Sequence, residues 1–192
     1  TLTGQAIIKE SNKILQQFVK EKLRLTDDEL AKFDPIIYND TDSVYITIKP
    51  LIEKLGIPFI NRVGRISKET HSLVEEITEK LNKEIKKWST KTLNSKDCRF
   101  IFKRETICDY GIFLQKKRYV LHILDDEGIP QNKYKYTGVE VVHSRRKLQF
   151  SQDLNLKTQG FDISIDFNDL LCNIFSIDVF AFFHDLNQNT SA

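Results

Sequence analysis

Two stretches of the chain repeat apolar residues at the three- and four-residue spacing of an amphipathic helix, and several others alternate with the period of a strand. The first helical pattern covers residues 1–24. The second follows Ser67, a residue type favoured at helix N-caps. Its expected buried stripe is Leu73, Ile77, Leu81, Ile85 and Trp88. We expect its opposite side to face solvent, because that side carries Lys80, Lys83, Lys86 and Lys87.

The strand-like stretches are short and are separated by turn residues. An apolar run at 36–38 and an alternating run at 43–48 flank a polar turn at 39–42. Val44, Ile46 and Ile48 are expected on one face of the second run, with Tyr45 and Thr47 on the other. Four more strands are expected at 99–107, 111–114, 118–124 and 134–142, with a hairpin turn at 125–128.

The remaining stretches show no clear period. Residues 25–34 are typical of a surface loop and residues 50–65 of a connector, and no helical or strand period is expected after residue 147. Two helices among antiparallel strands predict an α+β fold, in which an antiparallel sheet packs on two long helices.

Composition narrows the class of protein. No run of about 18 apolar residues predicts a membrane-spanning helix, and no signal peptide is visible at the start. Cys98, Cys108 and Cys172 lack metal-ligand spacing, which favours free thiols in a reducing compartment such as the cytoplasm. The chain has no methionine and starts directly on helix-like sequence, so we expect a fragment of a longer protein.

Charge is distributed unevenly along the chain. Residues 99–147 hold 11 Lys and Arg against 6 Asp and Glu, a net charge of +5. Residues 148–192 hold 1 against 6, a net charge of −5, although the whole chain has a formal net charge of +2. The basic middle segment indicates a polyanionic partner.

The polar turn carries the candidate chemistry. Side chains two apart in an extended chain point to the same side, so Asp40 and Asp42 are expected to present two carboxylates at the tip of one hairpin. Hard cations such as Mg²⁺ take oxygen ligands of this kind. An ordinary polar hairpin turn explains the same residues equally well, since Asn and Asp favour turns.

The stretch from Tyr38 to Ser43 resembles motif C of family B DNA polymerases, Tyr-Gly-Asp-Thr-Asp-Ser, with Asn39 in place of the glycine. Because Asn tolerates a left-handed backbone, the turn is expected to survive this change. The resemblance implies that Asp42 is a catalytic residue and direct metal ligand, and that Asp40 is a secondary one. Thr41 and Ser43 support the hairpin in the same comparison.

A second stretch resembles the Lys-x-Tyr region of the same family, which leads from palm to thumb and holds the primer–template duplex. It comprises Lys116, Lys117, Arg118 and Tyr119, followed after a hairpin by Gly138. Glu105 stands where the family carries an acidic residue near the primer end. The implied division is the C-terminal half of the palm at 1–115, the duplex grip at 116–147 and an unassigned, aberrant or appended tail at 148–192. Lys117 and Tyr119 are expected to share one face, with Arg118 turned away.

The resemblance, which is greatest to bacteriophage enzymes, implies a magnesium-dependent DNA-directed DNA polymerase of DNA replication. Such an enzyme uses two Mg²⁺ ions to add deoxynucleoside triphosphates to a primer. The family's other motifs, namely the motif A aspartate, the nucleotide-binding fingers and the exonuclease, are absent from this sequence. They are expected on other polymerase segments, without which this chain is inactive. The implied location is the cytoplasm, of the host cell if the protein is viral.

Two alternatives remain open. Asp40 and Asp42 also fit the opening motif of haloacid-dehalogenase-like phosphatases, with Asp40 as nucleophile, and Asp125-Asp126 loosely fit their closing acid pair. Antiparallel pairing of 43–48 with 36–38 distinguishes the polymerase hypothesis from this one. The other alternative is a non-catalytic fragment that binds duplex DNA through Lys116, Lys117 and Arg118.

Overall fold

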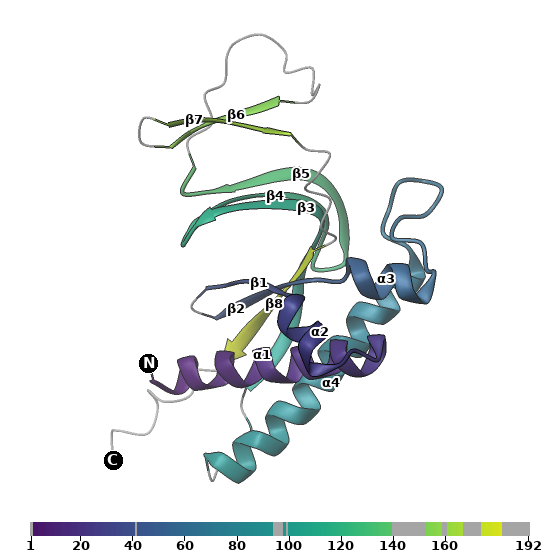
Figure 1. Ribbon diagram of the computed structural model, residues 1–192, viewed down its shortest axis with the longest axis vertical. Helices are drawn as coiled ribbons and strands as arrows, with labels where there is room; N and C mark the ends of the chain where they lie inside the picture. The colour runs from purple at the N-terminus through teal and green to yellow at the C-terminus, as the bar shows by residue number, and fades with distance from the viewer. Residues whose placement is uncertain are drawn as a thin grey trace, which may run out of the picture.

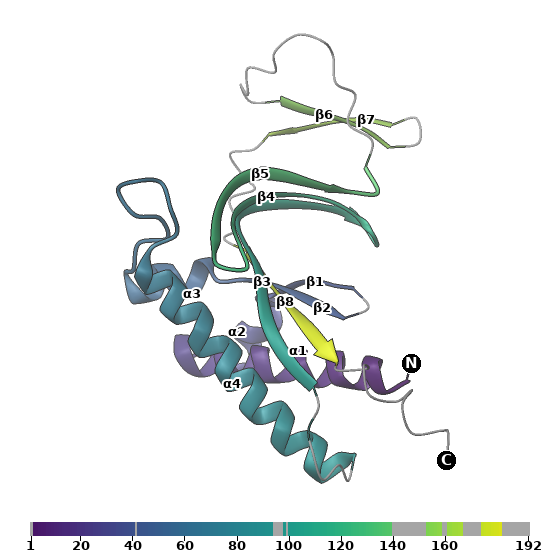
Figure 2. The same cartoon turned by 180° about the vertical axis from the view of Figure 1, so that it is seen from behind.

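The computed structural model describes residues 2–40, 42–93, 98, 100–139, 153–158, 161–166 and 174–181. Over these residues the fold is α+β, with helices and two antiparallel sheets (Figure 1, Figure 2). The helices lie together on one side of the β1–β2 hairpin, and strands β3, β4 and β5 curve over its other side. None of the helices in this described part is both long and apolar enough to cross a membrane.

The two long helices are confirmed. They are α1, Leu2–Leu23, and α4, Lys68–Thr92. The side chain of Ser67 caps α4 by accepting a hydrogen bond from the Thr70 backbone N–H at 3.0 Å. The predicted stripe of α4 is buried at Leu73, Ile77, Leu81 and Ile85 and half-buried at Trp88. Of the predicted lysine face, Lys80 is half-buried and Lys83, Lys86 and Lys87 are exposed.

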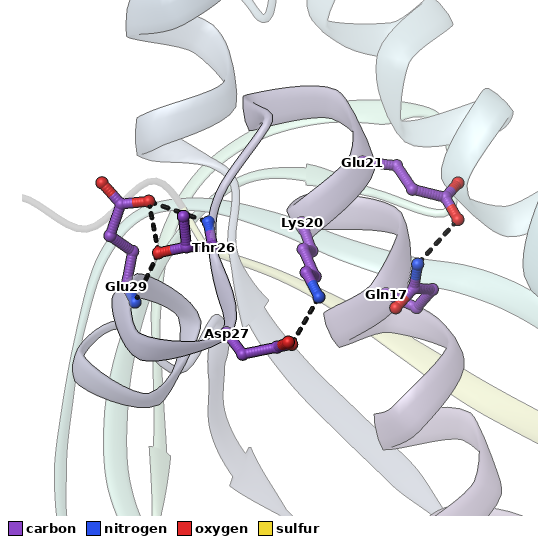
Figure 3. A network of polar contacts seen from close by, with 6 residues as sticks. All are labelled: Gln17, Lys20, Glu21, Thr26, Asp27 and Glu29. Carbon is purple, nitrogen blue, oxygen red and sulfur yellow. Dashed lines mark hydrogen bonds and ion pairs between the residues drawn. The ribbon is translucent and has the colours of Figure 1, made fainter.

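Two short helices correct the expected loop and connector. Helix α2, Asp27–Lys32, begins with a capping box in which Thr26 and Glu29 exchange hydrogen bonds, and Lys20 of α1 ion-pairs with Asp27 (Figure 3). Helix α3, Lys49–Leu55, has a proline in its first turn and ends at Gly56, whose left-handed φ of 64° suits a C-cap. Both helices are short and lack a long apolar repeat, so only their capping residues indicate them in the sequence.

The main sheet has six strands in the order β1-β2-β8-β3-β4-β5. Its members are β1 Ile36–Asn39, β2 Ser43–Thr47, β3 Phe100–Gln115, β4 Arg118–Asp126, β5 Ile129–Thr137 and β8 Ile174–Ala181. A second sheet pairs β6, Asp153–Thr158, with β7, Phe161–Asp166. Three strands therefore form after residue 147, where none was expected, and β8 pairs with both β2 and β3.

Strand β3 is a single long strand, although the sequence predicted two. Its register with β4 shifts between Ile107 and Tyr110, and such irregularities increase the local twist of a strand. The whole strand is strongly curved and passes over the hairpin (Figure 1). The next turn is formed by Glu127 and Gly128, both with positive φ as in a type I′ hairpin. Strand β5 consequently begins earlier than predicted.

The described side chains form two cores, one on each face of β2. Val44, Ile46 and Ile48 pack with α1, α3 and α4 in the larger core. Tyr45 faces the other way, into a smaller core with residues of β3 and β4. The predicted alternation along β2 is confirmed, and it sets one face of the hairpin against helices and the other against the curled strands.

Asn82 fixes α4 to the start of β3. Its side-chain N–H donates to the Phe102 carbonyl at 2.9 Å, and its side-chain oxygen accepts from the Phe102 N–H at 2.7 Å. The Phe102 side chain is fully buried in the larger core. The two hydrogen bonds to its backbone therefore fix the position of β3 along α4.

We predict that Asn82→Ala lowers the free energy of unfolding by about 2 kcal/mol, since each lost hydrogen bond contributes roughly 1 kcal/mol. Urea unfolding followed by circular dichroism measures the change. Lys83→Ala, at the exposed neighbouring position of α4, is the control and should stay within about 0.5 kcal/mol of wild type. Equal effects of the two substitutions would show that the hydrogen bonds between Asn82 and Phe102 contribute nothing to the free energy of unfolding.

Candidate metal and nucleic-acid site

The acidic turn is the tip of an antiparallel hairpin, as predicted. Strands β1 and β2 pair antiparallel, with Tyr38 opposite Tyr45 and Asn39 opposite Val44. The Asp40 N–H donates to the Ser43 carbonyl at 3.0 Å and closes the turn. Asp40 is half-buried, Asp42 is exposed and Ser43 is buried, whereas Thr41 lies outside the described residues. The turn therefore presents Asp42 to solvent from a backbone fixed on both sides.

Asn39, which the sequence resemblance compares with a glycine, does not take the left-handed backbone that was expected there. It lies in β1, in register with Val44, and its φ is not positive. Its side-chain oxygen is buried, and the structure gives it no hydrogen-bond donor within the described part of the chain. Asn39 is the last residue of β1 and directly precedes Asp40.

The basic cluster forms the two-residue turn between β3 and β4. Gln115 pairs with Arg118, so Lys116 and Lys117 are the loop residues, and Lys117 has a positive φ of 61°. Lys116 and Lys117 are exposed and Arg118 is half-buried. A tight turn displays adjacent lysines more fully than a strand would, because the backbone reverses between them.

Four aromatic rings join the hairpin to this turn. Tyr38 and Tyr45 of the hairpin pack against Phe113 of β3 and Tyr119 of β4 with centroids 5.2–5.7 Å apart. The Lys117 N–H donates to the Tyr38 hydroxyl at 2.8 Å, and the Tyr45 and Tyr119 hydroxyls lie 3.3 Å apart. We call these four residues the aromatic bridge. Two segments 79 residues apart in sequence meet through it.

Tyr119 belongs to this bridge. The ring is only 6% exposed, and its hydroxyl lies beside Tyr45. It does not share an exposed face with Lys117, so in this structure Tyr119 holds the turn in position. The expectation that it contacts nucleic acid stays a prediction.

Gly138 supports the turn from the next strand end. It has a φ of +59°, and a Cβ at this position would lie 2.2 Å from the Lys117 carbonyl oxygen and 3.2 Å from Arg118 Cγ. Only a residue without a side chain permits this approach. Gly138 is therefore tied to the shape of the basic turn.

Glu105 and Asp125 are held at another part of the sheet. Glu105 lies before the bend of β3, where its carboxylate ion-pairs with Lys135 at 3.3 Å and its carbonyl accepts from the Glu127 N–H at 2.7 Å. Asp125 is 2% exposed, ion-pairs with Arg104, and accepts a hydrogen bond from the Gly128 N–H at 3.0 Å. Both residues stabilise the β4–β5 turn.

The donors at the hairpin fit a shared metal ion better than an enclosed one. Among the described residues, no three His, Cys, Asp or Glu side chains gather as a metal-binding group. Asp40 and Asp42 supply two carboxylates. Mg²⁺ keeps several waters and is usually held by one or two carboxylates together with substrate phosphates. This donor set suits an ion that a phosphate-bearing ligand helps to bind.

Comparison with models of protein families and with curated proteins finds no match to this chain. The site therefore rests on its own geometry. The sequence predicted the acidic hairpin and singled out the basic residues and Gly138, but it did not predict the turn at Lys116–Lys117 or the contacts of Tyr38 and Phe113. The alternation that turned Tyr45 away from the helices was the available signal for an aromatic core on that face.

We predict that Gly138→Ala destabilises the fold and disorders the Lys116–Lys117 turn. Gly56→Ala is the matched control, because Gly56 has a similar φ of +64° but nothing within 4 Å of an added Cβ. The control should cost about 1–2 kcal/mol for the left-handed backbone. Gly138→Ala should cost roughly a further 1–3 kcal/mol for the clash. Urea unfolding of both variants tests this, and equal losses would contradict the proposed contact with Lys117.

Proposed function

We propose that this chain is part of a magnesium-dependent, DNA-directed DNA polymerase of family B, of the bacteriophage type. The acidic hairpin provides ligands for the metal ions, and the basic turn holds the primer–template duplex. Deoxynucleoside triphosphates are the second substrate. Polymerase segments that carry motif A, the fingers and the exonuclease are the partners of the chain. A cytoplasmic location, in the host cell if the protein is viral, belongs to the same proposal.

One observation carries this proposal: the hydrogen bond from the Lys117 N–H to the Tyr38 hydroxyl, 2.8 Å long. It joins the segment that ends in Asp40 and Asp42 to the turn that displays Lys116 and Lys117. An enzyme that extends any DNA sequence needs cations for the phosphate backbone beside carboxylates for the metal, without reading bases. The aromatic bridge supports that arrangement.

Each group has a distinct role in the proposed reaction. Bound Mg²⁺ ions would lower the barrier by stabilising the attacking and leaving oxygens. Asp42, the more exposed carboxylate, is the proposed direct ligand, and Asp40 tunes the site from a half-buried position. Lys116 and Lys117 bind phosphates of the duplex, and Arg118 assists them. Ser43, whose carbonyl closes the turn, and Thr41 support the hairpin.

The phosphatase alternative fits the geometry less well. Strand β2 pairs antiparallel with β1, whereas the phosphatase hypothesis requires a helix after Asp42. Asp125, part of its second acid pair, is buried against Arg104. The isolated chain, which carries no motif A aspartate, is better described as a duplex-binding fragment that gains activity with its partner segments.

We predict that Lys117→Ala weakens duplex DNA binding by this chain about equally for two unrelated sequences. It should also lower the slope of log affinity against log salt by about one unit, since one phosphate contact is lost. Fluorescence anisotropy across a salt series measures both. Lys86→Ala, which removes an exposed lysine from α4, is the matched control and should leave the slope unchanged. A loss of affinity confined to one DNA sequence would contradict the proposed binding of Lys117 to the phosphate backbone.

We predict weak Mn²⁺ binding by the isolated chain, with a dissociation constant above about 0.1 mM, because water must fill most of the coordination shell. Calorimetric titration measures it. Asp42→Asn should abolish the binding, whereas Asp28→Asn, at an exposed position on α2, should not. A tight site, or binding that is insensitive to Asp42→Asn, would argue against the proposed ligands. Asp42→Asn should also abolish nucleotide incorporation when the chain is joined to its partner segments.

A further inference from the structure

A row of aromatic rings crosses β3, β4 and β5 on the face opposite the aromatic bridge. Tyr110, His122 and Tyr134 are direct cross-strand neighbours, and Tyr136 follows two residues later on β5. Successive rings are 5.0, 4.6 and 6.2 Å apart between centroids, with interplanar angles of 25°, 31° and 27°. Each ring plane is therefore inclined by 31° or less to the next one. We call these four residues the outer row.

Polar contacts fix the edges of the inner three rings. His122 hydrogen-bonds to Asp109 at 2.7 Å and to Asn132 at 2.8 Å, and the Tyr110 and Tyr134 hydroxyls bond to each other. The hydrogen bond to Asp109 raises the pKa of His122 above its ordinary value, and burial raises the pKa of Tyr110. The row is therefore preorganised, with each ring held by its neighbours.

Tyr136 is the accessible end of the row. It is 37% exposed and lies on β5, an edge strand of the sheet. The adjacent positions on this face, Ile112 and Val120, are 4% and 2% exposed, so access is confined to the edge. The exposed part of the Tyr136 ring, at the edge and beside the stacked Tyr134, is accessible to a planar ligand.

Cations flank this edge. Arg118 lies two residues before Val120, the cross-strand partner of Tyr136, and so shares its face. Its Cγ approaches Gly138, two residues beyond Tyr136. Exposed Lys116 and Lys117 form the adjoining turn. A stacking surface bordered by three basic residues complements a nucleic acid, which carries planar bases on a phosphate backbone.

We propose that the outer row is a binding site for single-stranded nucleic acid, in which an unpaired base stacks on Tyr136 and the adjoining phosphates contact Arg118 and the Lys116–Lys117 turn. This inference rests on the proposed function for the nature of the polyanion, and it adds a second, unpaired strand to the duplex already assigned to the turn. Bases within a duplex already stack on each other, so the ring face selects unpaired bases. Stacking is tolerant of sequence, as a template strand requires.

The experiment measures binding of the chain to a fluorescent 12-residue oligo(dT) and to a blunt 12-base-pair duplex by anisotropy. Tyr136→Leu removes the ring, and Tyr136→Phe keeps the ring without the hydroxyl. We expect Tyr136→Leu to weaken oligo(dT) binding about 5- to 100-fold, since stacking contributes roughly 1–3 kcal/mol per base. Tyr136→Phe should restore binding, and neither variant should change duplex affinity by more than about twofold. Thermal unfolding of both variants confirms that they fold.

The outcomes separate this inference from the proposed function. Wild-type binding to the duplex alone, or equal loss of both ligands in Tyr136→Leu, overturns the outer row as a single-strand site. Equal weakening by Tyr136→Phe and Tyr136→Leu also overturns it, because the hydroxyl would then be the contact. The polymerase proposal is tested independently by nucleotide incorporation in the chain joined to its partner segments. Incorporation can fail while oligo(dT) binding still depends on Tyr136.

Discussion

The contact between the β1–β2 hairpin and the β3–β4 turn places the acidic hairpin beside the basic turn. It is made by the aromatic bridge, whose ring pairs each add about 0.5–1.5 kcal/mol beyond the burial of their area. The hydroxyls at its core are satisfied within it, by the Lys117 N–H on Tyr38 and by the Tyr45–Tyr119 pair. Strand β8 joins β2 to β3 within the sheet, and the aromatic bridge adds a direct contact between the hairpin and the β3–β4 turn.

The two cores have different roles: the larger one holds the helices to the sheet, and the smaller one positions the basic turn. The larger core joins α1, α3 and α4 to one face of β2 and to the first half of β3. Asn82 fixes the position of β3 along α4. The smaller core lies beyond the bend of β3 and positions the basic turn. A change in the larger core is therefore expected to lower the free energy of unfolding. A change at Tyr119 or Gly138 is expected to alter the basic turn as well as the stability of the fold.

The sequence predicted those elements whose signal is local. The hairpin follows from an apolar run, a turn of Asn and Asp, and an alternating run, and α4 follows from its cap and its stripe. Helix α2 was missed because its six residues carry no stripe, although Thr26 and Glu29 give a capping signature. The sequence predicted two strands with residues 108–110 between them, whereas register shifts keep these residues within β3. The Tyr38–Lys117 contact could not be predicted, because it spans 79 residues.

On the proposed function, electrostatics couples metal binding to nucleic-acid binding. The turn of Lys116, Lys117 and Arg118 attracts a phosphate backbone to within reach of Asp40 and Asp42. Phosphates and carboxylates repel each other there, and the repulsion is strongest where the surface excludes water. A bound divalent cation would offset this repulsion, because carboxylate and phosphate oxygens are both ligands that such an ion takes. The metal ion should therefore bind more tightly when DNA occupies the turn. Reciprocity then requires the metal ion to tighten DNA binding by the same factor.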